Sequence, residues 1–202
     1  MSDPSLLTVP LCGPTASDIA DLTSVLIDMQ SARRYAELYL RQVHFSADDP
    51  RGEIKQALWV ASVISYRRII ARSKSSHVKG RPRLGLDENW TRSLSPELLA
   101  SHNRIDEIAN RHVAHRVNKD MQMIAVNAEL VPPPRPPEVV NVETRTLNQV
   151  RPDPALVHHL IAICEQLIAD TRRRRDALRA NVVDQLNTQH LSQVYRGESP
   201  EV

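Results

Sequence analysis

Residues 95–120 read SPELLASHNRIDEIANRHVAHRVNKD and carry the clearest helix start in the chain. The hydroxyl of Ser95 can cap a helix, and Pro96 suits the first helical position because an N–H there would have no partner. Glu97 then places a carboxylate in the first turn. An uninterrupted helical pattern follows, so the stretch predicts a long third helix.

Two long helices are predicted before this one. Residues 15–43 repeat apolar positions every three or four residues, with Thr15 or Ser17 as the expected N-cap. Residues 50–74 are apolar on nearly all sides in their middle, which indicates a helix that crosses the core.

A fourth long helix opens at Asp153 and Pro154 and extends to about residue 187. Aromatic residues make up only 3 % of the chain, and only five glycines occur. The β-branched residues form no repeated period-two runs, which disfavours a β-sandwich. We therefore expect an all-α fold, an antiparallel bundle of four long helices.

Two connecting segments differ in character. Residues 75–94 contain glycines, a proline and several cations, and are typical of a long basic loop. Residues 121–150 include five prolines within six positions, which block a helix. They predict an irregular or β-hairpin excursion between the third and fourth helices; a polyproline ligand for a partner domain is the alternative. The expected domain spans residues 15–187, with an N-terminal tail at 1–14 and a C-terminal tail at 188–202.

Composition narrows the class of protein. The formal net charge is +2, so any surface for nucleic acid must be local. Cys12 and Cys164 have no paired spacing typical of a disulfide framework or a zinc site. No apolar run approaches the ~20 residues that span a bilayer. We expect a cytoplasmic protein with no membrane partner.

The third helix carries histidines on different faces. At about 100° per residue, Arg104, Arg111 and His115 share one stripe. His112 lies about 80° away on the side expected to face the core. His102 is expected at the surface, near the helix start.

Three interpretations of these histidines remain open. A metal site is disfavoured, because Asp106 and Glu107 lie about 180° and 80° from His115 on the helix. A structural role would place His112 in a hydrogen bond to a neighbouring helix. Acid–base chemistry on RNA needs a histidine to move protons and an arginine to stabilise charge on the phosphate, as Arg111 and His115 could do. A two-fold dimer would bring two such pairs together.

The line Ala109-Asn110-Arg111-His112-Val113-Ala114-His115 resembles a line late in the third long helix of the HEPN superfamily, in its abortive-infection-type branch. There the pattern is often Arg-Asn/Asp-Lys-x-x-Ala-His, and the order of elements along this chain is similar. The resemblance implies a small helical bundle, commonly dimeric, that binds RNA or cleaves it without a metal or other cofactor. It also implies association with toxin–antitoxin or phage-defence systems.

Carried over by position, the resemblance predicts site residues. His115 matches the family's histidine, and Asn110 matches the polar residue after its arginine. The line departs at the arginine, because Ala109 and Asn110 occupy the expected positions and Arg111 is the nearest candidate. We predict His115 as the acid–base group, Arg111 as the phosphate-stabilising group and Asn110 as their polar neighbour.

Further cations would contact the RNA backbone. These contacts would weaken with salt. The residues predicted to make them are Arg104, Lys79, Arg81 and Arg83. The expected partners are RNA, a second copy of the chain, and an antitoxin or other protein. The alternative function is a non-catalytic dimeric interaction module, whose partner docks on the histidine helix or the proline-rich excursion.

Overall fold

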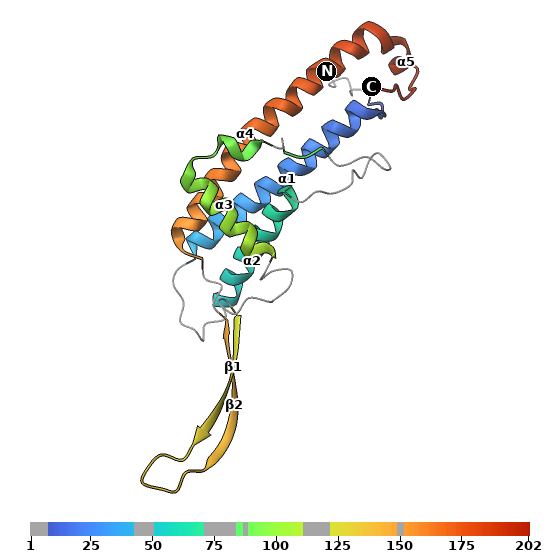
Figure 1. Cartoon of the computed structure of the whole chain (residues 1–202). Helices are drawn as coiled ribbons and strands as arrows, with labels where there is room; N and C mark the ends of the chain where they lie inside the picture. Colours follow the sequence, from blue (N-terminus) through green and yellow to red (C-terminus); the bar gives the residue numbers. More distant parts are fainter. Residues whose placement is uncertain (1–7, 43–50, 71–83, 87–88, 111–121, 149–151) are drawn as a thin grey trace.

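A computed structural model describes residues 8–42, 51–70, 84–86, 89–110, 122–148 and 152–202. The helices of the bundle are α1 (Pro14–Arg41), α2 (Arg51–Ile70), α3 (Pro96–Ile108) and α4 (Pro154–Gln185). Helix α1 packs along both α2 and α4, and α3 packs against α4 and α2. The predicted helical bundle is confirmed (Figure 1).

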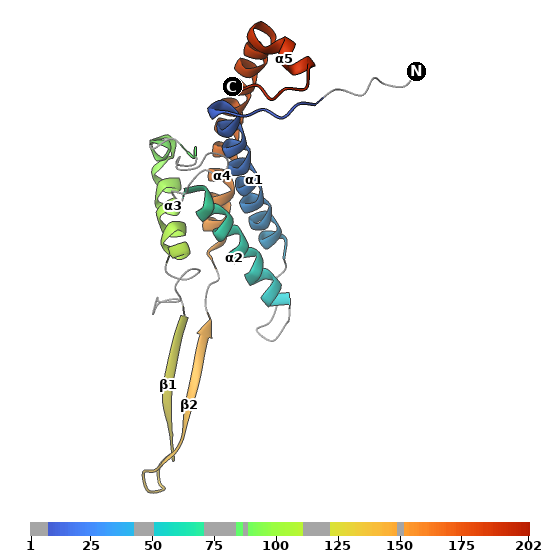
Figure 2. The ribbon, with the colours of Figure 1, turned by 90° about the vertical axis from the view of Figure 1, so that its right-hand side faces the viewer.

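The excursion between α3 and α4 is a β-hairpin. Strand β1 (Gln122–Leu130) pairs antiparallel with β2 (Val139–Asn148). Figures 1 and 2 show the hairpin projecting from one end of the bundle, while the described parts of both chain ends lie at the other. The prolines occupy the turn between the strands, where no ladder N–H is needed. The β-hairpin form of the predicted excursion is confirmed.

Capping residues explain where two of the helices begin. The Ser95 hydroxyl accepts a hydrogen bond from the backbone N–H of Leu98 at 3.3 Å, and Pro96 follows at the first helical position. The Asp153 carboxylate accepts from the backbone N–H of Ala155 at 3.0 Å. Both starts are confirmed. Within residues 75–94, expected to form a loop, residues Trp90–Ser93 form the 3₁₀ helix η1.

The start of α1 differs from the prediction. Neither Thr15 nor Ser17 is its N-cap; Gly13 holds that place, and Pro14 is the first helical residue. Gly13 has a φ of 100°, which glycine adopts without a Cβ clash. The backbone N–H of Thr15 donates instead to the carbonyl of Val202 at 2.9 Å.

The structure of residues 188–202 differs from the C-terminal tail that the sequence predicts. After α4 come the π-helical turn η3 (Leu186–His190) and the short helix α5 (Leu191–Tyr195). The chain then returns to the start of α1, where the Val202 N–H donates to the Cys12 carbonyl at 2.9 Å. Backbone hydrogen bonds between distant segments therefore hold this part of the chain, and the sequence shows no local signal for them.

The core lies between α1, α2, α3 and α4. Its largest side chains have less than 2 % of their surface exposed: Trp59, Tyr66, Leu22, Met29, Ile105, Ile108, Leu160 and Ile163. None of the described helices combines the length and the apolar character that crossing a bilayer requires.

Candidate functional site

Arg67 of α2 meets two polar residues of α3. Its Nε donates to Oδ1 of Asn110 at 3.1 Å, and its Nη1 lies 3.3 Å from Oδ1 of Asp106. The Asn110 amide also donates to Oδ2 of Asp106 at 3.1 Å. Each of the three residues contacts the other two, so Asn110 is held on both its oxygen and its nitrogen. This group of contacts fixes the end of α3.

Tyr66, the residue before Arg67, contacts a histidine one turn earlier on α3. Its hydroxyl lies 2.8 Å from Nδ1 of His102. The ring of Trp90 packs edge-on against the same imidazole, with centroids 4.8 Å apart. His102 is therefore half-buried between α2 and η1, and the prediction that it lies at the surface is wrong.

Burial sets the protonation states of this pair. It raises the pKa of Tyr66, with smaller contributions from Cys164 and Asp106. Burial also lowers the pKa of His102, and the nearby carboxylate of Asp106 opposes that shift. Tyr66 therefore keeps its proton, and its hydroxyl shares a hydrogen bond with Nδ1 of a neutral His102.

Helical spacing explains why these groups lie together. His102, Asp106 and Asn110 follow one another at intervals of four residues, so they form one stripe along α3. Tyr66 and Arg67 are consecutive on α2, and each reaches a different part of that stripe. The residues Tyr66, Arg67, His102, Asp106 and Asn110 are called the α2–α3 polar cluster below.

The structure separates some of the predicted site residues. Asn110 lies in the α2–α3 polar cluster. Arg104 is exposed and forms an ion pair with Glu107 at 2.7 Å. Six residues along a helix correspond to about 120° of rotation, so Arg104 and Asn110 occupy different sides of α3. The remaining predicted residues lie outside the described part of the chain: His115, Arg111, Lys79, Arg81 and Arg83.

Sequence reasoning missed the contribution of α2. Arg67 lies among the cations at the end of α2, where a favourable interaction with the helix dipole already accounts for them. A useful signal was present on α3: a histidine, an aspartate and an asparagine at four-residue intervals form a polar stripe next to the buried Ile105 and Ile108. Such a stripe at the edge of a core indicates polar partners on a neighbouring helix.

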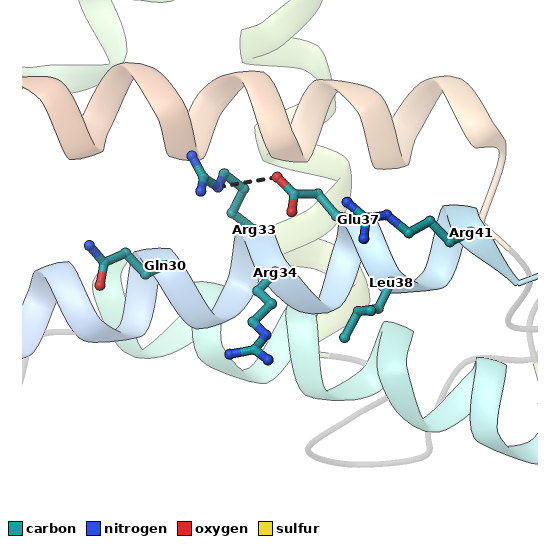
Figure 3. Close-up of a pocket in the computed structure, with 6 residues that line it drawn as sticks. All are labelled: Gln30, Arg33, Arg34, Glu37, Leu38 and Arg41. Carbon is teal, nitrogen blue, oxygen red and sulfur yellow. Dashed lines mark ion pairs between the residues drawn. The ribbon is translucent and has the colours of Figure 1, made fainter.

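Apart from the α2–α3 polar cluster, α1 carries a basic surface with a shallow pocket (Figure 3). The pocket is lined by Gln30, Arg33, Arg34, Glu37, Leu38 and Arg41. Arg33 lies 3.3 Å from Glu37 and 3.8 Å from Glu165 of α4. Arg34 and Arg41 are exposed and form no ion pair within the described residues. The pocket is a water-exposed basic surface formed by one helix.

Among the described residues, no group of three or more His, Cys, Asp or Glu side chains is placed to hold a metal ion. Comparison with family models, with curated proteins and with solved structures finds no match to this chain.

Proposed function

We propose that the chain is a HEPN-like RNA-binding protein that cleaves RNA without a metal. The observation that carries this proposal is the contact of Arg67 with Asn110 at 3.1 Å. Asn110 is the polar residue of the line that resembles the family, and that line lacks an arginine at the expected position. Arg67 brings a guanidinium to the same place from α2.

The proposed reaction uses residues that follow Asn110 in the sequence. His115 accepts the proton of an RNA 2′-hydroxyl, whose oxygen bonds to the adjacent phosphorus. The bond from phosphorus to the 5′-oxygen breaks, and that oxygen takes up the proton that His115 received, leaving a cyclic phosphate and a 5′-hydroxyl. Arg111, assisted by Arg67, stabilises the negative charge that builds up on the phosphate. Asn110 positions Arg67.

The binding part of the proposal rests on the cations of the basic loop and α3. Lys79, Arg81, Arg83 and Arg104 would contact phosphates, so affinity falls as salt rises. The cytoplasm is the compartment where such an activity would meet RNA, and an antitoxin or other protein would restrain it.

The test is cleavage of single-stranded RNA by the full chain in EDTA. We expect His115→Ala to slow cleavage by about 10²-fold or more, and Arg67→Ala by about 10²-fold. Arg68→Ala is the matched control, because Arg68 is the next residue of α2 and pairs with Asp28 instead. Equal rates for wild type and His115→Ala would overturn the catalytic assignment.

The alternative is a non-catalytic dimeric interaction module. The apolar side chains exposed on the β-hairpin favour it: Leu130, Val139, Val140 and Val142 each have more than half of their surface exposed. Light scattering combined with RNA titration separates the two functions. A dimer with no RNA affinity at ~50 mM salt supports the interaction module, because phosphate contacts are strong at that ionic strength.

A further inference from the structure

Helix α2 carries apolar residues on its outward side as well as on the side that faces the core. The core side includes Trp59, Val63 and Tyr66, which are fully buried. Away from them, Ile54 has 57 % and Ile64 has 41 % of its surface exposed. Figure 2 shows α2 between α1 and α3, the two helices against which it packs. A helix that is apolar all round is normally covered on every side, so the outward side of α2 is suited to a partner.

The outward apolar residues of α2 form one stripe. Ile54, Ala57, Ala61 and Ile64 follow one another at intervals of three, four and three residues, and they lie within an arc of about 80°. This is the spacing of the two apolar positions of a heptad, which form the seam between two packed helices. Ala57 is exposed and Ala61 is half-buried, and such small side chains let two helix axes approach closely. These four residues are called the α2 stripe below.

The α2 stripe has the same order of residues from either end. Its isoleucines are the outer members and its alanines the inner ones, and the spacing is symmetric about the level of Trp59. An antiparallel pair of such helices, related by a two-fold axis at this level, places Ile54 opposite Ile64 and Ala57 opposite Ala61. A two-fold interface requires a surface that is complementary to itself in this way. The pattern therefore favours a second copy of the chain as the occupant.

We propose that α2 packs antiparallel against α2 of a second copy of this chain, about a two-fold axis level with Trp59. In this register Glu53 of one copy and Arg67 of the other lie on the same flank of the seam, about 3 Å apart along the helix axis. Glu53 is exposed, and the Arg67 side chain retains 38 % of its exposure. Charges at the edges of a seam set the orientation of the two helices. The unlike charges of Glu53 and Arg67 therefore support the antiparallel register.

Parallel packing of the same two helices is disfavoured by Arg68. Arg68 follows Ala61 by seven residues, so it continues the seam beyond Ile64. A parallel pair would bring the two copies of Arg68 together in the seam. The antiparallel pair keeps them about 27 Å apart along the axis, because each lies nine residues from the two-fold.

The interface uses one face of a single helix in each copy. A seam of this length is short compared with the surface that a permanent dimer buries, so we expect a dimer of micromolar affinity. The proposal needs neither RNA nor catalysis. It can therefore fail or succeed independently of the ribonuclease proposal.

Oxidative cross-linking of the full chain tests the register. Two variants are prepared, Ile54→Cys and Ile64→Cys, both in a Cys12→Ser background that removes an exposed thiol and keeps the buried Cys164. At an interaxial distance of about 8 Å, opposite seam residues have Cα atoms about 6 Å apart, a distance that a disulfide spans. We expect a mixture of the two variants to form a covalent dimer under mild oxidation.

Each cysteine variant alone is the matched control for the mixture. Two copies of position 54, or two copies of position 64, lie about 15 Å apart along the axis, which is too far for a disulfide. Neither variant should cross-link with itself. Cross-linking of a single variant as readily as of the mixture, or no cross-linking of the mixture, would overturn the antiparallel register.

Analytical ultracentrifugation of the full chain tests the seam itself. Ala57→Arg places a long charged side chain where Ala61 of the other copy approaches, and it should weaken the dimer about 10-fold or more. Ala169→Arg is the matched control, because Ala169 of α4 is also exposed and also follows an exposed glutamate by four residues. This control should leave the dimer unchanged. An equal effect of the two variants would overturn the proposal, and so would a monomeric wild type at ~200 μM, which would leave the α2 stripe to a different protein.

Discussion

The hydroxyl of Tyr66 lies 2.8 Å from Nδ1 of His102 and links the buried interior of α2 to the edge of α3. Tyr66 is fully buried, while its partner is half-exposed. This bond and the contacts of Arg67 one residue later set how α3 lies against α2. The stability of this contact and its dependence on pH are both measurable.

Tyr66→Phe should lower the free energy of unfolding by about 1 kcal/mol. The change removes the hydrogen bond to His102 and leaves the ring packing intact. Urea denaturation at pH 7.5 measures the loss. Tyr195→Phe is the matched control, because Tyr195 has 74 % of its surface exposed and should change stability by no more than ~0.5 kcal/mol. Equal stability of Tyr66→Phe and wild type would show that the bond contributes nothing.

Stability should fall as pH drops below about 6.5, the usual pKa of histidine. Burial lowers the pKa of His102 in the folded state, so the unfolded chain binds more protons between that lowered pKa and 6.5. The contribution of His102 is complete above this window and is lost as pH falls through it. Denaturation midpoints from pH 5 to 8 for wild type and His102→Gln isolate the effect. The difference in denaturation midpoint between the two proteins should be larger at pH 7.5 than at pH 5. A constant difference would argue against a pH-dependent contribution of His102.

The ion pair of Arg67 with Asp106 should show a coupling energy of no more than about 1 kcal/mol. Both side chains retain over a third of their exposure, at 38 % and 35 %, so water screens the charges. A double-mutant cycle of Arg67→Ala and Asp106→Ala measures this coupling. The pair Arg33 and Glu37, four residues apart on α1, provides a reference cycle, expected at ~0.3 to 0.5 kcal/mol. A coupling well above 1 kcal/mol would mean that the cluster is dry.

Gly13→Ala should destabilise the protein by ~1 to 3 kcal/mol and detach the last residues. The φ of 100° disfavours any side chain, and an added Cβ would lie 2.5 Å from the carbonyl oxygen of Val202. Thermal unfolding and limited proteolysis near the C-terminus report the two effects. Gly52→Ala is the control, since a Cβ there meets nothing within 4 Å in the first turn of α2. That variant should be neutral or slightly more stable.

Local signals were sufficient for most of the fold. Ser95 and Asp153 have side chains that satisfy the backbone N–H groups of a helix start wherever the helix later packs. The five prolines between β1 and β2 exclude a helix by their own geometry. The N-cap of α1 failed as a prediction because Gly13 is favoured there by Val202, which is distant in sequence.

The sequence by itself determined the helices, the non-helical excursion between α3 and α4, and the polar stripe of His102, Asp106 and Asn110, because each follows from the propensities and spacing of residues close together in the sequence. Only the tertiary structure decided that Tyr66 and Arg67 meet this stripe, across separations of 36 and 43 residues. Periodicity tells which face of a helix is apolar. Which neighbour that face meets, and at what rotation, depends on the simultaneous packing of all the helices around one core.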